Sequence, residues 1–276
     1  PPPPSGDAKC IAVHLPRTGG GGNQEVMMRP NKLRELWSAK KKANNIWLSL
    51  GNAYAAELIA HQGWDSVTID LQHAPADYKD AVAMLTAVST TDCVPLVRVP
   101  WNDPGDIMRV LDAGAYGVMC PTVDTPEQAQ RFVGAARYHP LGSRSAGPNR
   151  AALYGGADYV AKANDTIITM AQIETAKGLA NVEAIAKTPG LDMLFVGPSD
   201  LGLTLGTPGN ANPTEKVTLD AIDKILHAAH AAGIHAGIFG TTADFAKSMF
   251  AKGFDLVTVT TDGTLIGAGK TLSAIR

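Results

Sequence analysis

The chain has 276 residues, of which 45% are hydrophobic and 18% are charged, enough apolar side chains to bury a sizeable core. Its 24 basic and 26 acidic residues give a formal charge of −2, which excludes the net positive charge that draws proteins to nucleic acid and anionic membranes. We therefore expect neither nucleic acid nor a membrane among its partners.

Three cysteines, Cys10, Cys93 and Cys120, are too few and too scattered for a disulfide framework, and no C-x-x-C pair suggests a zinc or redox site. No apolar stretch approaches the ~18 residues that a membrane span needs, and no charged start followed by an apolar run marks a secretory signal. These observations predict a cytoplasmic protein.

The first residues differ in composition from the rest of the chain. Pro1–Pro4 form a proline run and Gly19–Gly22 a glycine run, and little between them could pack into a core. We interpret residues 1–27 as a flexible N-terminal extension and residues 28–276 as a single domain.

Along this domain, short apolar runs rich in β-branched residues alternate with longer segments of helical spacing. The eight predicted strands are Ile46–Leu50, Ser66–Asp70, Val94–Val99, Gly117–Cys120, Ile168–Glu174, Met193–Gly197, His235–Phe239 and Leu256–Thr260. The predicted helices are Ala53–His61, Tyr78–Val88, Ile107–Leu111, Glu127–Ala136, Lys177–Ala186, Glu215–Ala232, Asp244–Ala251 and Leu265–Ile275. Strands that are apolar on both faces and joined by helices form parallel sheets, and eight such units in about 250 residues indicate a (β/α)8 TIM barrel. A doubly wound open sheet is the alternative, although no G-x-G-x-x-G follows the first strand.

Polar residues gather at the carboxyl ends of the predicted strands, where the chemistry of a barrel takes place. A ring of four titratable groups is expected at this mouth: His73, Arg98, Glu174 and Asp200. Burying such groups is costly unless they pair or bind a cation. Glu174 and Asp200 follow adjacent strands, so their carboxylates can converge on one ion. Oxygen ligands completed by water and substrate suit Mg²⁺ or Mn²⁺, for which Co²⁺ can substitute.

Other residues near this mouth suggest substrate contacts. Gly197 lets the backbone approach closely, and the amides of Ser199 and Asp200, at the predicted start of a helix, can bind a carboxylate. Pro198, between Gly197 and Ser199, has no backbone N–H to donate. We assign the segment Gly197-Pro198-Ser199 to substrate binding. Trp47 in the first strand either lines the barrel beneath the substrate or packs in the core.

Five motifs follow one another along the chain: Asp70-Leu71-Gln72-His73, Val97-Arg98-Val99-Pro100-Trp101-Asn102-Asp103-Pro104, Leu111-Asp112-Ala113-Gly114, Gln172-Ile173-Glu174-Thr175 and Val196-Gly197-Pro198-Ser199-Asp200-Leu201. In this order they resemble the motifs of the HpcH/HpaI aldolase family, the metal-dependent, class II pyruvate aldolases. The resemblance implies that Glu174 and Asp200 hold the metal and that Arg98 contacts the keto oxygen. It also implies that His73 is the general base and that Asp112 orients it.

The activity implied by the resemblance is reversible cleavage of 4-hydroxy-2-oxo acids to pyruvate and an aldehyde through a metal-stabilised pyruvate enolate. Arg98 and the metal would stabilise the developing enolate charge, and His73 would take the proton from the 4-hydroxyl. One alternative is an oxaloacetate decarboxylase or a carbon–carbon bond-forming synthase that uses the same enolate, and another is a barrel that has lost activity. The family also implies homo-oligomers, hexamers built as trimers of dimers that exchange a C-terminal helix, here Leu265–Ile275.

Two more residues are assigned to the substrate. Gln172 lies in the same motif as Glu174, at the end of the fifth predicted strand. Arg144 lies in the Gly- and Ser-rich loop 140–150, and members of the family have a similar loop that borders the site. Arg144 would neutralise a second carboxylate or a phosphate of the substrate, unless the loop is purely structural.

Several of these assignments have structural alternatives. Arg98 could clamp Asp70, and Asp112 could be a solvated residue at a helix C-terminus. His73 could be a hydrogen-bonded loop residue. Some members of the family carry Glu at the position of Gln72, and an amide there changes how the water network beside the histidine is held.

Overall fold

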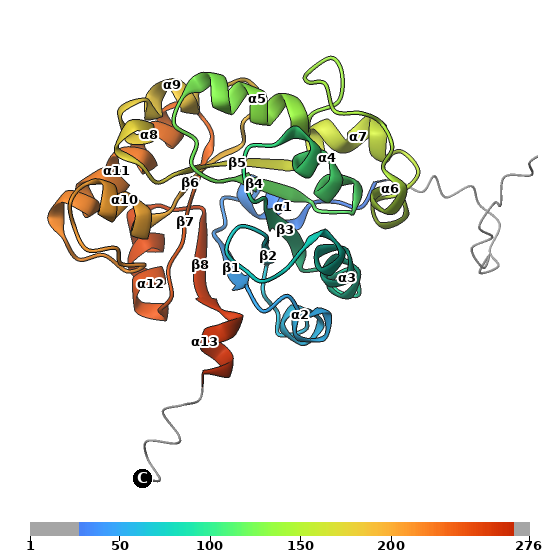
Figure 1. Ribbon diagram of the computed structural model, residues 1–276, viewed down its shortest axis with the longest axis horizontal. Coiled ribbons are helices and arrows are strands. Elements are labelled where there is room, and N and C mark those ends of the chain that lie inside the picture. The colour runs from blue at the N-terminus through green and yellow to red at the C-terminus, as the bar shows by residue number, and fades with distance from the viewer. Residues whose placement is uncertain (1–27, 268–276) are drawn as a thin grey trace, which may run out of the picture.

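Within residues 28–267, which the computed structural model describes, eight parallel strands close into a barrel in chain order, so that β8 pairs with β1 (Figure 1). The strands are β1 Ala43–Leu48, β2 Ser66–Asp70, β3 Val94–Arg98, β4 Gly117–Cys120, β5 Ile168–Ile173, β6 Met193–Val196, β7 His235–Ile238 and β8 Leu256–Thr261. The predicted (β/α)8 barrel is confirmed, and each predicted strand overlaps an observed one.

Helices surround the barrel (Figure 1). They are α1 Lys32–Ser38, α2 Ala53–Ala60, α3 Tyr78–Val88, α4 Pro104–Asp112, α5 Pro126–Ala136, α6 Asn149–Gly155, α7 Tyr159–Thr166, α8 Ala176–Ala180, α9 Val182–Ala186, α10 Pro198–Thr204, α11 Lys216–Ala231, α12 Ala243–Lys252 and α13 Asp262–Ile266. Several begin at a residue whose side chain accepts a backbone N–H of the first turn, among them Asn52, Asp77, Asp103 and Thr242. Such caps fix where the helix starts and so how long each loop at the barrel mouth is.

Helix α1 lies across the amino end of the barrel. Arg34 donates hydrogen bonds to the carbonyls of Thr166 and Ile167, immediately before β5. Trp37 Nε1 donates to the carbonyl of Asp255, immediately before β8. The end of the barrel opposite the strand carboxyl ends is therefore covered by the chain itself.

The sequence pattern does not predict α6 or α7. Both follow loop 140–150, and the pair of glycines Gly155-Gly156 interrupts the helical spacing between them. Neither helix has a side-chain cap that would mark its start. The residues from Asn149 to the start of β5 are thus mostly helical, where the sequence pattern indicates a loop at 140–150 and no helix after it.

The C-terminal helix begins earlier than predicted. Thr261 accepts the N–H of Thr264 as an N-cap, so α13 starts at Asp262 and reaches Ile266. Residues 268–276 lie outside the described residues, as does the predicted extension at residues 1–27. The exchange of a C-terminal helix between subunits therefore stays a prediction.

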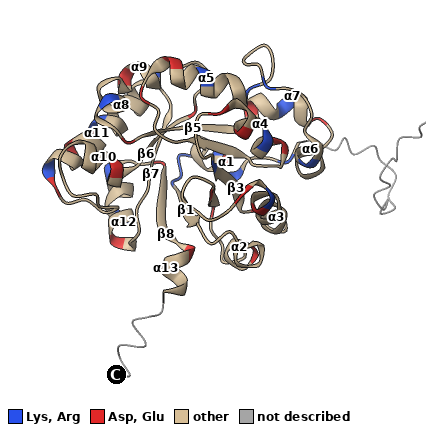
Figure 2. Cartoon of the chain, viewed as in Figure 1, with Lys and Arg blue, Asp and Glu red and all other residues tan. Residues whose placement is uncertain are grey.

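Charged side chains of both signs are interspersed over the outer helices (Figure 2). Exposed ion pairs such as Lys216–Asp220 and Lys252–Asp223 join some of them, and pairs of this kind contribute little to stability. No helix in the described part of the chain is both long and apolar enough to cross a membrane.

The interior of the barrel contains a polar layer beneath the mouth. Asn45 Nδ2 donates to Thr258 Oγ1 at 2.9 Å, and Asn45 Oδ1 accepts from Ser66 Oγ at 3.0 Å and from Thr68 Oγ1 at 3.1 Å. All four side chains are fully buried, so these bonds satisfy groups that would otherwise destabilise the core. Because side chains alternate along a strand, Trp47 lies on the same inner face as Asn45 and reaches the mouth.

Arg137, just after α5, is one of the largest fully buried side chains. Its guanidinium holds the loops that lead into β5 and β6, through bonds to the carbonyls of Asn164, Ile167 and Gly190 and to the carboxylate of Asp192. Removal of such a buried guanidinium is strongly destabilising, because several buried acceptors lose a hydrogen-bond donor at once.

We expect Arg137→Met to lower the free energy of unfolding by about 3–5 kcal/mol. Arg34→Met is the matched control, since Arg34 bonds the same Asp192 carboxylate from a side chain that is 30% exposed, and its loss should cost about 1 kcal/mol or less. Urea unfolding followed by circular dichroism measures both values. Equal losses for the two variants would contradict a special role for the buried guanidinium.

Candidate active site

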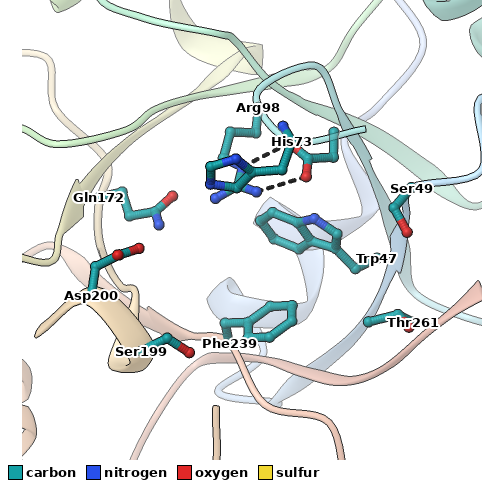
Figure 3. Close-up of a pocket in the computed structure, with 10 residues that line it drawn as sticks. Trp47, Ser49, His73, Arg98, Gln172, Ser199, Asp200, Phe239 and Thr261 are labelled. Atoms are coloured by element: carbon teal, nitrogen blue, oxygen red, sulfur yellow. Dashed lines mark hydrogen bonds and ion pairs between the residues drawn. The ribbon is translucent and has the colours of Figure 1, made fainter. Parts of the chain in front are cut away.

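A pocket of about 370 Å³ lies at the carboxyl ends of the strands. Six of the residues that line it are predicted site residues: Trp47, His73, Arg98, Gln172, Ser199 and Asp200. Four others are Ser49, Asp70, Phe239 and Thr261. Figure 3 shows these ten side chains arranged around one cavity.

Asp70 and Arg98 form a buried ion pair on one wall. They are the last residues of β2 and β3 and are direct partners in the register of these strands. Arg98 Nε donates to Asp70 Oδ1 at 2.9 Å and Nη2 donates to Oδ2 at 2.7 Å (Figure 3). Burial alone would raise the pKa of Asp70, but the hydrogen bonds and charge of Arg98 outweigh it and hold that pKa below its ordinary value. The clamp considered from sequence is therefore present.

The clamp leaves part of Arg98 available. The face of its guanidinium lies 4.7 Å from the ring of Trp47, a cation–π contact that fixes its plane. The third nitrogen, Nη1, has no protein acceptor among residues 28–267. Arg98 thus combines a structural bond to Asp70 with a free donor in a pocket that it lines.

Glu174 and Asp200, the predicted metal ligands, come from adjacent strand ends, and of the two only Asp200 lines the pocket. Glu174 directly follows β5 and is 4% exposed, whereas Asp200, in the first turn of α10, is exposed. Burial raises the pKa of Glu174, and the negative charge of Asp200 raises it further, although two hydrogen bonds from Thr122 oppose this. The negative charges of the two carboxylates thus act on each other, and a shared cation would relieve this repulsion.

Gln172 adds a third oxygen beside the two carboxylates. Its Nε2 donates to Glu174 Oε2 at 2.5 Å, which leaves Oε1 pointing elsewhere. Gln172 Oε1 is buried and has no hydrogen-bond partner among the described residues. A buried acceptor without a partner is costly in an empty site and is satisfied by a bound cation, water or substrate donor.

Thr122 positions Glu174 and was not predicted. Both its backbone N–H and its hydroxyl donate to Glu174 Oε1, at 2.8 and 2.9 Å. Its φ angle is +51°, a left-handed conformation that is unfavourable for a β-branched side chain. Strain of this kind persists where the surrounding structure requires it, often at functional sites. The sequence around Pro121-Thr122 does not predict this contact, because Glu174 follows a different strand, β5.

Gly197 is required by close packing. It directly follows β6, and a Cβ built on it would overlap Glu174 Oε2 and Gln172 Nε2. Gly197 and Pro198 do not line the pocket themselves, whereas Ser199 in the next position does. The predicted role of Gly197, to let other groups approach the backbone, thus applies to protein side chains in this structure.

His73 lines the pocket from the turn after β2 and is exposed. Its backbone N–H lies 3.5 Å from Asp70 Oδ1, and no carboxylate among the described residues bonds its imidazole. The implied partner, Asp112, lies at the C-terminal end of α4, where it accepts a 2.6 Å bond from Arg144. The structure of one chain does not bring Asp112 and His73 together, so that expectation is not met here.

The structure does not place Arg144 at the pocket. Arg144 is 3% exposed and does not line the pocket. It pairs with Asp112, and its guanidinium lies 4.5 Å from the ring of Tyr138 and 5.5 Å from that of Tyr159. The nearby carboxylate and the two tyrosine rings satisfy its charge, so it has a structural role in packing the segment before α6.

The departure noted at Gln72 has a structural counterpart, and three polar residues near the pocket were missed. Gln72 Oε1 is buried without a partner in residues 28–267, next to the turn that carries His73. Ser49 and Thr261 were missed, although both stand at strand ends, where the rule used for the other residues would have found them. Asp262, which bonds Ser49, was also missed because its contact joins the two ends of the domain.

The sequence profile of the HpcH/HpaI aldolase/citrate lyase family matches residues 44–268. The chain belongs to this family. A hydroxypyruvate/pyruvate aldolase of Rhizorhabdus wittichii is 41% identical over 238 residues, which cover 86% of this chain and 95% of the relative. A 5-keto-4-deoxy-D-glucarate aldolase of Shigella dysenteriae is 38% identical over 235 residues, covering 84% and 91%.

The solved structures agree with this assignment. The crystal structure of an HpcH/HpaI aldolase/citrate lyase family protein from Burkholderia cenocepacia has a TM-score of 0.82 at 36% identity, covering 89% of this chain and 99% of the other. This HpcH/HpaI family member is thus a carbon–carbon lyase with a TIM-barrel fold, as the resemblance predicted.

We expect Gly197→Ala to reduce aldol cleavage by about 10- to 100-fold while the protein still folds, because the new methyl group displaces Glu174 and Gln172. Gly134→Ala is the control, since a Cβ at that position in α5 meets nothing within 4 Å. Steady-state rates and thermal melting of both variants test this. An unchanged rate in Gly197→Ala would mean that the positions of the two side chains are not critical.

Proposed function

We propose that this protein reversibly cleaves 4-hydroxy-2-oxo acids to pyruvate and an aldehyde, with a divalent metal ion, Mg²⁺ or Mn²⁺, held by Glu174 and Asp200. The observation that carries the proposal is the Gln172 amide, which bonds Glu174 through Nε2 while its Oε1 lacks a partner among the described residues, and which lines the pocket together with Asp200, Arg98 and His73. The aldolase names of the relatives support the reaction class.

The donor set fits a hard divalent cation. Glu174, Asp200 and Gln172 offer oxygen atoms only, which Mg²⁺ and Mn²⁺ prefer, whereas zinc favours nitrogen and sulfur. Among the described residues no cluster of three His, Cys, Asp or Glu side chains stands ready for a metal. Water and the substrate would therefore complete the coordination. When bound, the ion acts as a Lewis acid that polarises the keto carbonyl of the substrate.

Arg98 and the first turn of α10 would bind the 2-oxo acid. Arg98 Nη1 can donate to the keto oxygen, where negative charge develops as the carbon–carbon bond breaks. The backbone N–H groups of Ser199 and Asp200 lie in the first turn of α10, where no intrahelical acceptor exists for them, and can donate to the substrate carboxylate. These contacts orient the bond that breaks.

His73 would move the proton. In cleavage the 4-hydroxyl loses its proton to His73, directly or through a water, and the bond between C3 and C4 breaks as the aldehyde carbonyl forms. The bonding electrons pass to C3 and the keto oxygen of the pyruvate fragment, and protonation of C3 gives pyruvate. Asp70, which already lies beside the backbone of His73, would assist this base.

A coupled assay tests the proposal. Chelator-treated protein is supplied with Mg²⁺ or Mn²⁺, and pyruvate release from a panel of 4-hydroxy-2-oxo acids and from oxaloacetate is followed with an NADH-consuming reporter. We expect metal-restored release from the hydroxy-oxo acids, and its absence in Glu174→Gln and Asp200→Asn. Turnover of oxaloacetate alone would instead favour the decarboxylase or synthase activity, and no turnover of either would refute both.

Thr122 provides a test that does not depend on turnover. We expect Thr122→Val to weaken Mn²⁺ binding by about 10-fold, because it removes the hydroxyl that orients Glu174 and keeps the β-branched shape. Thr122→Ser retains the hydroxyl and should bind Mn²⁺ nearly as the original protein does. Electron paramagnetic resonance of free Mn²⁺ gives the affinities, and equal affinity in the two variants would show that the hydroxyl is unimportant.

A further inference from the structure

The pocket has two chemically different sides. Gln172 and Asp200 lie on one side, and Ser49 and Thr261 lie on the other, with Trp47 and Phe239 between them (Figure 3). The metal and the pyruvate fragment of the proposed reaction occupy the first side. The second side would therefore surround the other fragment, the aldehyde.

Ser49 presents a hydrogen-bond acceptor to the second side. Its hydroxyl proton is donated to Asp262 Oδ1 at 2.9 Å, so the lone pairs of Ser49 Oγ are left for a ligand. Asp262 is 1% exposed and also accepts the backbone N–H groups of Ser49, Leu50 and Gly263. No lysine or arginine in residues 28–267 forms an ion pair with it. A negative charge without a cationic partner thus lies directly behind Ser49.

Thr261 presents a donor next to this acceptor. Its Oγ1 accepts the N–H of Thr264 at 3.1 Å and lies 2.9 Å from Thr264 Oγ1. Either threonine hydroxyl can give its proton to the other, so Thr261 can turn its own proton to a ligand when Thr264 donates. The two hydroxyls that line this side thus offer a ligand hydroxyl one acceptor, Ser49, and one donor, Thr261.

The rest of the second side is apolar and carries no cation. The ring of Phe239 meets that of Trp47 edge to face, with centroids 5.2 Å apart. Arg98 is the one lysine or arginine among the described residues that line the pocket, and Asp70 already pairs with it. A carboxylate on the aldehyde would meet the acceptor Ser49 and the charge of Asp262 with no counterion.

Resting on the function proposed above, we propose that Ser49, Thr261, Trp47 and Phe239 form an acceptor subsite for short, uncharged aldehydes that carry a hydroxyl group. The pocket volume of about 370 Å³ is small for a ligand site, which suits a short acceptor. Aldehydes that carry a carboxylate are disfavoured there, and Ser49 and Thr261 are the residues that determine this specificity.

The experiment compares three acceptors of similar size in aldol addition to pyruvate: glycolaldehyde, propionaldehyde and glyoxylate. The first carries a hydroxyl and the second a methyl group on the carbon next to the carbonyl, whereas in the third this carbon is itself the carboxylate. The intrinsic reactivities of these aldehydes differ. The measured quantity is therefore the ratio of kcat/KM for two acceptors, compared between the original protein and each variant. Intrinsic reactivity cancels in this comparison.

We expect Ser49→Ala to lower the glycolaldehyde-to-propionaldehyde ratio by about 3- to 10-fold, the value of one neutral hydrogen bond. Thr261→Val should lower it by a similar factor, and the control Thr261→Ser should not. Thr261→Lys supplies the missing cation and is expected to raise the glyoxylate ratio. Unchanged ratios in Ser49→Ala and Thr261→Val would overturn the subsite.

Deuterium exchange at the methyl group of pyruvate, measured by NMR without any acceptor, separates this outcome from failure of the proposed function. The exchange reports on the first side of the pocket alone. Its absence in the original protein with Mg²⁺ or Mn²⁺ would refute the pyruvate aldolase chemistry itself. Normal exchange in all variants, with the expected shifts in the acceptor ratios, would support both the function and the subsite.

Discussion

Closing eight parallel strands into a barrel places all their carboxyl ends in one ring. Every charged group at that ring must then find a partner in a small, largely buried space. The remaining geometry of the mouth follows from this constraint. Asp70 and Arg98 meet because they are register partners on neighbouring strands. Gly197 has no side chain because Glu174 and Gln172 occupy the space that a side chain would need.

The carboxylates at the barrel mouth have three different kinds of partner. Asp70 is neutralised by a guanidinium, and its pKa falls accordingly. Asp262 is held by backbone N–H groups and a hydroxyl and has no cationic partner in the described chain. Glu174 accepts two hydrogen bonds from Thr122 and one from Gln172, but burial and the negative charge of Asp200 still raise its pKa. The charge that the protein leaves least compensated is thus found where a metal ion would act, which is typical of functional sites.

Sequence reasoning was most successful where a rule links position to topology. Apolar periodicity predicted the strands, and the rule that barrel chemistry lies at strand ends led to residues such as Arg98 and Asp200. It failed for Arg144, because a residue's presence in a family-like loop does not determine where its side chain points, and Asp112 was the partner within reach. Thr122 could not be predicted, because its role depends on a left-handed backbone conformation and on a strand that is distant in the sequence.

One wall of the pocket lies where the first and last strands of the barrel meet. Ser49 follows the first strand and Thr261 ends the last one, so the wall they share exists only where the two ends of the sheet meet, at a register shift between Asn45 and Ile46. The carboxylate and guanidinium walls come instead from β2, β3 and the segments that follow β5 and β6. Substitutions of Ser49 or Thr261 can therefore alter this wall without disturbing the others. The closure of the barrel is thus a place where substrate preference can diverge during evolution while the bond-breaking chemistry is retained.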